Sequence, residues 1–247
     1  MIVAGNWKMN ASKRAVTELL SGLKQGLAGA REAELVVFPP FPYLAQVQQE
    51  LVSTCIRIGV QNVSAAPKGA YTGEVSLAMA AEFGVTYVLV GHSERRALFA
   101  EDDAQVAAKY VATQAASLTP ILCVGETLAQ REQGETLAVV KAQVQAVIDA
   151  AGAGSFANAV IAYEPVWAIG TGLTASPAQA QAVHQAIREH VAQVAPSEAA
   201  SLKILYGGSV TATSAAELFA QADIDGGLVG GASLQAESFL AIGQAAQ

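Results

Sequence analysis

The sequence predicts an α/β protein built as a single (β/α)8 barrel, with eight parallel strands inside eight outer helices. Short apolar runs typical of β-strands alternate with amphipathic, alanine-rich stretches along the whole chain. Dividing the 247 residues by eight gives about 31 residues per unit, which suits a barrel of roughly 250 residues. No linker interrupts the series, so one domain is expected over 1–247. An open, doubly wound sheet is the alternative, but no Gly-x-Gly-x-x-Gly opens the first helix.

The expected strands are short and almost continuously apolar, as buried parallel strands are when helices cover them. Strict alternation with helices requires parallel pairing, because each crossover returns the chain to the same end of the sheet. In chain order the expected strands are Ile2–Asn6, Glu34–Phe38, Ile56–Val60, Thr86–Val90, Pro120–Val124, Val160–Tyr163, Lys203–Tyr206 and Gly227–Val229.

The segments between these strands carry apolar residues at helical spacing. The expected helices lie near 13–27, 42–51, 76–83, 102–117, 135–151, 177–194, 212–221 and 235–243. Ser176 before Pro177 is a typical helix start, with an N-cap followed by proline at the first helical position. Thr211 or Thr213 is the expected N-cap of the seventh helix.

Composition limits the classes of partner. A net charge of −7 and a pI near 5.0 argue against nucleic acid or an anionic membrane, although a small anionic ligand can still bind a locally positive site. No apolar run approaches the roughly 20 residues of a spanning helix, and the first residues lack the positive region of a signal peptide. Cys55 and Cys123 show no metal-ligand spacing and are expected to be free, buried thiols. A cytoplasmic protein is expected.

Polar residues gather where the expected strands end. A barrel of this class has its active site at the carboxyl ends of the strands. These ends offer Asn6 and Lys8 after the first strand, His92 and Glu94 after the fourth, and Glu164 after the sixth. Each residue alone fits a surface charge or a structural imidazole. Their convergence on one ring indicates a catalytic base, an acid and a fixed cation.

Two glycine clusters follow the seventh and eighth expected strands. Gly207-Gly208-Ser209 and Gly230-Gly231 allow backbone N–H groups to approach a ligand closely, and a following helix adds its positive end. Tight strand-to-helix turns explain one such cluster well, but two at adjacent strands favour a phosphate on the substrate.

The segment directly after Glu164 has the composition of a lid. Proline fixes its start and two glycines loosen its far end, while bulky apolar residues lie between them. Such residues need cover, and a carboxylate beneath an apolar flap is suited to act as a general base away from water. The expected lid comprises Pro165, Val166, Trp167, Ala168, Ile169, Gly170, Thr171 and Gly172.

Over essentially its whole length the chain resembles the triosephosphate isomerase family, whose fold is the TIM barrel. Five motifs carry the resemblance, in the right order and at the right strand ends. They are the runs 5–10 (Gly-Asn-Trp-Lys-Met-Asn), 90–96 (Val-Gly-His-Ser-Glu-Arg-Arg), 162–172 (Ala-Tyr-Glu-Pro-Val-Trp-Ala-Ile-Gly-Thr-Gly), 206–210 (Tyr-Gly-Gly-Ser-Val) and 228–234 (Leu-Val-Gly-Gly-Ala-Ser-Leu).

The resemblance implies interconversion of dihydroxyacetone phosphate and glyceraldehyde 3-phosphate through an enediolate, with no metal and no organic cofactor. It implies that Glu164 is the base and that neutral His92 polarises the carbonyl and moves a proton between the two oxygens. Lys8, positioned by Asn6, would supply positive charge, and Glu94 would support the site. The phosphate would be held by Gly170, Ser209, Gly230 and Gly231.

The segment Gln61–Glu74 is too long for a simple connection, and it resembles the loop that the family uses to reach into a neighbouring subunit. The resemblance implies a homodimer in which Thr72, beside Gly73 and Glu74, supports the partner's site. Arg95, Glu101 and Lys109 fit either charge pairs at that interface or a solvated surface.

The sequence also departs from the family pattern, but away from the expected catalytic groups. Leu173 stands where the family commonly carries lysine at the end of the lid. Ala100 replaces a common glycine, and Gly227 replaces a common phenylalanine.

Two other functions compete with the isomerase. An aldolase on the same fold would need a Schiff-base lysine at a central strand end, but Lys203 begins a strand and Lys8 follows the first. A non-catalytic phosphate-binding barrel protein would be expected to lack Lys8, His92 or Glu164, and all three are present.

Overall fold

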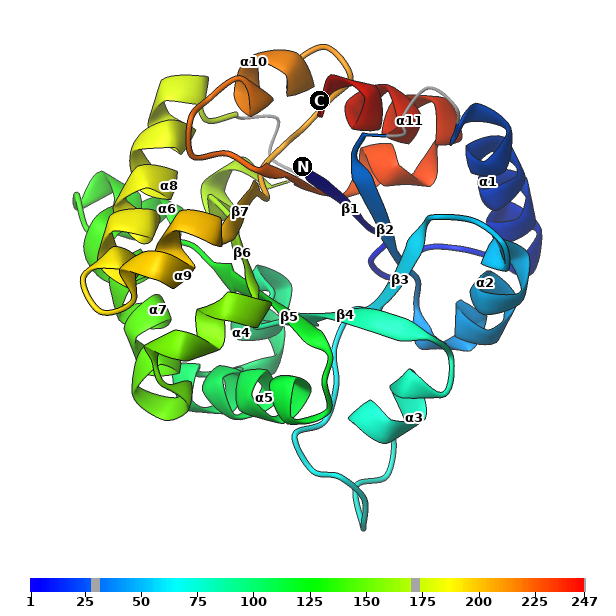
Figure 1. The fold of residues 1–247 in the computed structure, drawn as a ribbon, viewed down its shortest axis with the longest axis horizontal. Coiled ribbons are helices and arrows are strands. Elements are labelled where there is room, and N and C mark those ends of the chain that lie inside the picture. Colours follow the sequence, from blue (N-terminus) through cyan, green and yellow to red (C-terminus); the bar gives the residue numbers. More distant parts are fainter. Residues whose placement is uncertain (28–31, 170–173, 247) are drawn as a thin grey trace.

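Eight parallel strands close into a barrel in which each strand pairs with the next and β8 pairs with β1 (Figure 1). The computed structural model describes residues 1–27, 32–169 and 174–246. The expected fold class is confirmed, and four of the strands have the expected bounds. The strands are β1 Ile2–Asn6, β2 Glu34–Phe38, β3 Arg57–Val60, β4 Val85–Val90, β5 Thr119–Val124, β6 Val160–Tyr163, β7 Lys203–Tyr206 and β8 Gly226–Val229.

Helices surround the barrel on its outer side (Figure 1). All eight expected helices are present within a few residues, and α4, α6 and α9 are additional short helices that the sequence reading missed. The described α-helices are α1 Lys13–Gly26, α2 Leu44–Leu51, α3 Leu77–Ala81, α4 Ser93–Phe99, α5 Asp103–Ala115, α6 Leu128–Glu132, α7 Thr136–Ala151, α8 Pro177–Ala192, α9 Pro196–Ser201, α10 Ala215–Phe219 and α11 Ala236–Ala245. Short 3-10 helices are η2 Phe41–Tyr43, η3 Ala153–Asn158, η4 Val166–Ala168 and η5 Gly231–Leu234.

One predicted helix start is confirmed and one is wrong. The Ser176 hydroxyl accepts a hydrogen bond from the Gln179 N–H and forms a capping box with that residue, as the sequence suggested. The N-cap position of α10 is Ser214, not Thr211 or Thr213. Thr211 instead accepts from the Ser214 N–H, which makes a turn before the helix begins.

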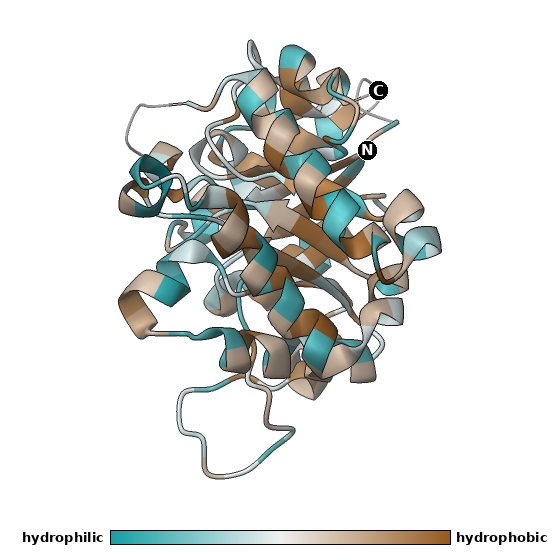
Figure 2. Cartoon of the chain, turned by 90° about the vertical axis from the view of Figure 1, so that its left-hand side faces the viewer, coloured by the Kyte–Doolittle hydropathy of each residue, from teal (hydrophilic) through white to brown (hydrophobic). Residues whose placement is uncertain are grey.

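Two apolar layers form the core. The inner layer fills the barrel with side chains from alternate strand positions, such as Phe38, Leu89, Ile121 and Leu205. The outer layer lies between the strands and the helices, which alternate apolar and polar residues along their length (Figure 2). Gly59 on β3 is required by this packing, because a Cβ there would lie 2.1 Å from Cε1 of Phe38. In the described part of the chain, no helix is long and apolar enough to cross a membrane.

The cysteine prediction is partly wrong. Both cysteines are free, and Cys123 is buried inside the barrel, but Cys55 is exposed in the turn before β3. Burial raises the pKa of the Cys123 thiol, and the negative charge of Glu164 raises it further. Cys123 is therefore a neutral packing residue.

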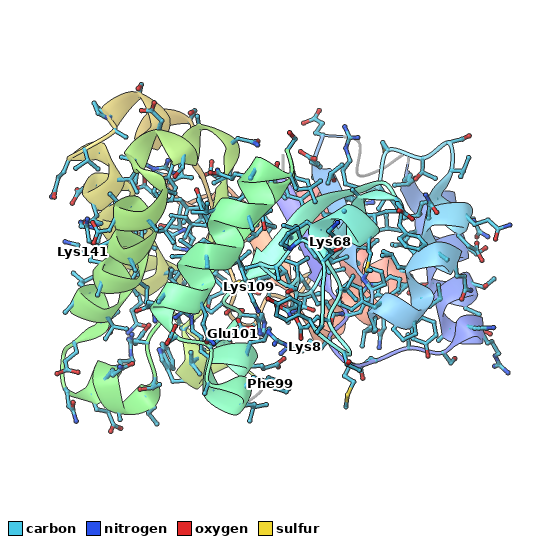
Figure 3. All side chains as sticks on the ribbon, turned by 90° about the horizontal axis from the view of Figure 1, so that it is seen from below. Lys8, Lys68, Phe99, Glu101, Lys109 and Lys141 are labelled. Carbon is cyan, nitrogen blue, oxygen red and sulfur yellow. The ribbon has the colours of Figure 1, made fainter. Side chains whose placement is uncertain are left out.

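The segment 61–76 between β3 and α3 projects from the barrel (Figure 1). Figure 3 views the molecule from that side, with Lys68 of the segment and Phe99, Glu101 and Lys109 labelled. Thr72, Gly73 and Glu74 at its tip are all exposed. These tip residues are not part of the barrel core, and their exposed surface is accessible to another molecule.

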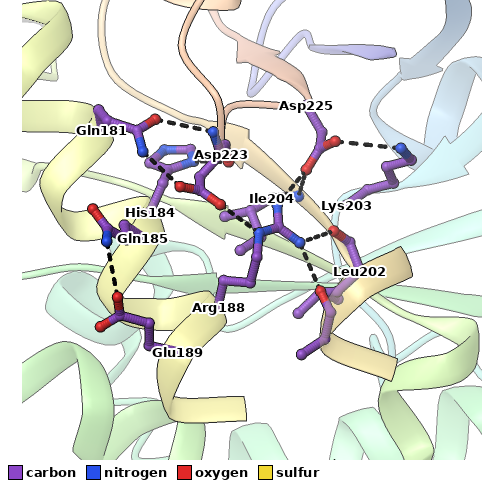
Figure 4. A network of polar contacts seen from close by, with 11 residues as sticks. Gln181, His184, Gln185, Arg188, Glu189, Leu202, Lys203, Ile204, Asp223 and Asp225 are labelled. Atoms are coloured by element: carbon purple, nitrogen blue, oxygen red, sulfur yellow. Dashed lines mark hydrogen bonds and ion pairs between the residues drawn. The ribbon is translucent and has the colours of Figure 1, made fainter. Parts of the chain in front are cut away.

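An ion-pair network joins α8 to the start of β7 and the turn before β8 (Figure 4). The Arg188 guanidinium donates to Asp223 at 2.6 Å and to Asp225 at 2.9 Å, and also to the carbonyls of Ala199 and Leu202, each at 2.8 Å. Because these groups lie at the amino ends of the strands, the network fixes the barrel on the side opposite the strand ends that carry the polar site residues.

Candidate active site

A cavity of about 370 Å³ opens at the carboxyl ends of the strands. It brings together residues from β1, β4, β6, β7 and β8, as the sequence predicts. Seven of the expected site residues line it, together with Ile169 of the expected lid; the seven are Asn6, Lys8, His92, Glu164, Ser209, Gly230 and Gly231. Asn10, Val210, Thr211, Leu228 and Ala232 also line the cavity and were not singled out from the sequence.

Glu164 lies directly after β6 and is almost fully buried. One carboxylate oxygen, Oε1, is 2.9 Å from Nε2 of His92, and the other, Oε2, accepts from the Ser93 N–H at 2.9 Å. Burial alone would raise the pKa of this carboxyl, but His92 and the Ser93 N–H outweigh it and the pKa is lowered. Glu164 is therefore ionised and able to accept a proton at neutral pH.

His92 caps the amino end of α4, which explains its orientation. Its Nδ1 accepts a hydrogen bond from the Glu94 N–H at 3.2 Å, so the ring proton lies on Nε2 and points at Glu164. Burial lowers the pKa of His92, while the Glu164 carboxylate opposes this and leaves the pKa raised in this arrangement. That raising effect depends on Glu164 staying beside the ring, and the Glu94 N–H favours the neutral form.

The backbone of Lys8 adopts a strained conformation. Its φ of 51° lies in the left-handed region, which costs a non-glycine residue about 1 kcal/mol or more. Two hydrogen bonds hold it there: the Lys8 N–H donates to Oδ1 of buried Asn6 at 2.9 Å, and Gln61 donates to the Lys8 carbonyl at 2.9 Å. The Lys8 ammonium contacts Glu94 Oε1 at 2.6 Å. Asn6 thus orients Lys8, and Glu94 restrains its charged end beside the cavity.

The glycines after β7 and β8 form the wall opposite these groups. A Cβ on Gly231 would meet no atom within 4 Å, so internal packing does not explain a glycine there. The Gly230 carbonyl accepts from both the N–H and the hydroxyl of Ser233, at 2.8 and 2.7 Å. This wall leaves room for a ligand to approach the backbone, as an anion site requires.

The expected lid is described from Pro165 to Ile169, while Gly170, Thr171, Gly172 and Leu173 lie outside the described residues. Val166–Ala168 form η4, with Ala168 fully buried, and Ile169 lines the cavity. The Trp167 indole donates to Glu126 Oε1 at 2.9 Å and stacks against Arg131, whose Cζ is 4.2 Å from the ring centroid. Pro165 and Ala168 are buried, and Val166, Trp167 and Ile169 are half-buried.

Glu126 was missed in the sequence reading. It is fully buried after β5 and accepts from the Tyr163 hydroxyl at 3.1 Å as well as from Trp167. The signal was the same as for Glu164, namely a carboxylate at a strand end after an apolar run. Glu94 and the 72–74 tip do not line the cavity, although Glu94 contacts Lys8. Among the residues that the structure describes, no group of three or more His, Cys, Asp or Glu is placed to hold a metal.

The fold and the cavity together define a (β/α)8-barrel protein with a buried carboxylate–imidazole pair, a nearby ammonium group and a glycine-lined wall. The sequence profile described as "Triosephosphate isomerase" matches residues 1–246. A protein of that name from Thiobacillus denitrificans is 60% identical over 245 residues, covering 99% of this chain and 98% of the relative. Another from Alcanivorax borkumensis is 59% identical over 246 residues, covering 100% of this chain and 98% of the relative. The chain belongs to the triosephosphate isomerase family.

Proposed function

We propose that this chain is an aldose–ketose isomerase of glycolysis and gluconeogenesis that interconverts dihydroxyacetone phosphate and D-glyceraldehyde 3-phosphate. One observation carries the proposal most strongly. The Glu164 carboxylate and the His92 Nε2 lie 2.9 Å apart at one side of a cavity whose other wall is glycine backbone. Family membership and the high identity to its relatives support the same reaction.

The proton transfers follow from the two groups. Glu164 removes a proton from the carbon next to the carbonyl, and the electron pair moves onto the carbonyl oxygen to form an enediolate. His92 donates its Nε2 proton to that oxygen and accepts the proton of the neighbouring hydroxyl. Glu164 then returns its proton to the former carbonyl carbon. A positioned base contributes about 10²–10⁴-fold, and a donor aimed at the developing oxyanion about 10²–10³-fold.

Lys8, Ser209, Gly230 and Gly231 are proposed to bind the substrate, and Gly170 is proposed to join them. The cation attracts the anionic substrate, and the backbone N–H groups of the glycine wall bind its phosphate. Asn6 and Glu94 act by orienting Lys8. The segment 165–172 is proposed to close over the cavity, because excluding water protects an enediolate that could otherwise expel the adjacent phosphate.

A coupled assay of glyceraldehyde 3-phosphate isomerisation tests this function, with the Glu164→Ala variant as control. The parent protein is expected to be active, and the variant is expected to lose about 10²–10⁴-fold in kcat because it lacks the base. Equal activity in the two proteins, or none in the parent, would contradict the proposal. An inactive parent would favour the alternative of a non-catalytic phosphate-binding protein. None of the described cavity contacts supports that alternative in particular.

We also propose that the protein is a homodimer formed through the face around the 61–76 segment. Tyr71 and Phe99 line one cavity and expose 55% and 64% of their surface, and Leu98, next to Phe99 in the chain, exposes 75%. Clustered exposed apolar side chains are typical of an interaction surface. A cavity of about 430 Å³ lined by Tyr71, Arg95 and Phe99 lies beside them. Glu101 pairs with both Arg95 and Lys109 beside this cavity, and these contacts lie within one chain.

In this dimer the exposed tip at Thr72, Gly73 and Glu74 reaches the partner subunit, where Thr72 supports the partner's site. Light scattering is expected to give twice the chain mass at micromolar concentration, whereas a monomer would contradict the arrangement.

We further propose that residues 1–247 act as one domain and that the enzyme is cytoplasmic, on the grounds of composition and charge given above. Limited proteolysis and cell fractionation test these two points.

A further inference from the structure

We propose that Gln143, on the outer helix α7, is a positioning residue for the isomerisation, because it clamps the backbone on which Glu164 rests. The inference rests on the proposed reaction but concerns a residue outside the cavity that binds substrate. Gln143 is half-buried and faces the end of β5 from the helix layer.

The clamp consists of two hydrogen bonds between one side chain and one residue. The Gly125 N–H donates to Gln143 Oε1 at 2.8 Å, and Gln143 Nε2 donates to the Gly125 carbonyl at 3.3 Å. Gly125 has no side chain of its own to pack, and its backbone is free to change conformation more readily than that of any other residue. A single amide that binds both of its polar groups therefore fixes the orientation of the Gly125 backbone.

The Gly125 backbone is in direct contact with the base. A Cβ on Gly125 would lie 1.8 Å from the Glu164 carbonyl oxygen, so the two main chains approach as closely as glycine allows. Hydrogen bonds flank the contact on both sides: the Glu164 N–H donates to the Val124 carbonyl at 2.7 Å, and the Val166 N–H donates to the Glu126 carbonyl at 3.2 Å. The segment that carries the base thus lies on residues 124–126, and Gln143 holds the middle of that segment.

The clamp closes a second cavity behind the base. This cavity, of about 270 Å³, is lined by Gln143, Gly125, Cys123, Ser93 and Glu164, and is separate from the glycine wall that faces substrate. Without the clamp, residues 124–126 can shift into this space and take the Glu164 backbone with them. The carboxylate would then lose its alignment on His92 and on the Ser93 N–H, whereas the groups proposed to bind phosphate would be unaffected.

The test compares Gln143→Met with Gln145→Met in the full-length protein. Methionine preserves the length and helix propensity of glutamine but cannot form the two hydrogen bonds. Gln145 lies on the same helix, and its amide donates to Asp149, not to the barrel. In Gln143→Met we expect kcat to fall about 10- to 100-fold, as a misplacement near 1 Å can cause, with KM for glyceraldehyde 3-phosphate changed less than about twofold. Gln145→Met is expected to match the parent.

The pH profile separates positioning from mere stability. Loss of the His92 and Ser93 contacts removes the interactions that lower the pKa of Glu164, so the acid limb of kcat/KM is expected to move to higher pH in Gln143→Met. A lower melting temperature with parental kcat and an unmoved acid limb would overturn the proposal, as would a raised KM at unchanged kcat. If Gln143→Met does not fold, Gln143→Asn, which keeps the amide but is one methylene too short, must show the same kcat loss. An inactive parent would contradict the proposed isomerase function itself. That outcome differs from failure of the Gln143 proposal, in which the parent is active and Gln143→Met keeps parental kcat.

Discussion

Glu164 is held by both of its carboxylate oxygens, and this sets what the residue can do. Oε1 faces His92 Nε2 and Oε2 accepts from the Ser93 N–H, each at 2.9 Å. To reach a substrate carbon the side chain must exchange one of these contacts for the substrate. The sequence predicted that Glu164 and His92 lie at strand ends of one ring, but it could not give their direct contact or the Ser93 contact, because a backbone N–H carries no residue-type signal.

Gly207 controls the room available to Glu164. A Cβ at Gly207 would lie 2.8 Å from Cγ of Glu164, closer than real Cβ contacts allow. Gly207→Ala is therefore expected to displace the base and lower kcat about tenfold or more, measured in the isomerase assay. Gly154→Ala, where a Cβ meets nothing within 4 Å, serves as the matched control and is expected to keep parental kcat. Parental activity in Gly207→Ala would mean that the base tolerates the shift.

Ala100 is strained where the family commonly has glycine. It ends α4 with a φ of 53°, in the left-handed region that favours glycine. Ala100→Gly is expected to raise the free energy of unfolding by up to about 1 kcal/mol, because it relieves this strain. Thermal denaturation measures the change. Ala97→Gly, inside the same helix, is expected to destabilise by about the same amount, and a stabilising effect there would contradict the explanation.

Among the elements, the strands were predicted more accurately than the helices. β1, β2, β6 and β7 have the expected bounds, and each is a largely apolar run of four or five residues. The short helices α4, α6 and α9 were missed, since five to seven residues are too few to show helical periodicity. Two of them, α4 and α6, follow the active-site ends of β4 and β5. The sequence therefore did not predict α4, the helix that positions His92 and the Ser93 N–H. It did identify His92 and Ser93 as part of the 90–96 motif.

Helix α8 carries a buried histidine that makes stability depend on pH. His184 is fully buried between Tyr163 and Tyr206, and burial lowers its pKa to about 4. The ring stays neutral in the folded chain and protonates near pH 6.5 in the unfolded chain. Its contribution to stability is fully present above pH 6.5 and is lost as the pH falls toward 4, by up to about 3 kcal/mol.

His184→Gln removes this titration and still offers a donor to the Asp223 carbonyl. The variant is expected to lose less free energy of unfolding between pH 7 and pH 4.5 than the parent, as urea denaturation at the two pH values would measure. His190→Gln, on the same helix, is the comparison: burial and Lys141 also lower the pKa of this less buried ring, so the variant is expected to keep more of the parent's acid sensitivity than His184→Gln does. An equal loss in parent and His184→Gln would exclude His184 as the source of acid sensitivity.

At the scale of the whole molecule, the barrel could be predicted from the count and alternation of its elements, but its outer faces could not. The assignment of residues 61–74 to a dimer loop rested on family resemblance. The structure adds an exposed apolar face and the Glu101 charge cluster beside it, which periodicity does not reveal because the partners come from separate elements.

Phe99 tests the assignment of that face. Phe99→Asp is expected to give a monomer by light scattering and to lower activity, because an ionised carboxylate on an apolar interface is costly to bury. Leu137→Asp, an equally drastic change at an exposed apolar residue of α7, is expected to leave the dimer intact. Dimers in both variants would place the interface elsewhere.

The pairing of β8 with β1 has a consequence for the order of the chain. Both ends of the sequence meet at one seam: β1 pairs with β8 in register from Ile2 with Gly226, and Phe239 of α11 packs against Gly5. In a closed barrel every strand pairs with two neighbours, so the structure does not require the chain to begin at β1. Joining the two termini by a short flexible linker and opening the chain at exposed Gly154, between α7 and β6, is therefore expected to give a circular permutant that folds to the same barrel and retains isomerase activity.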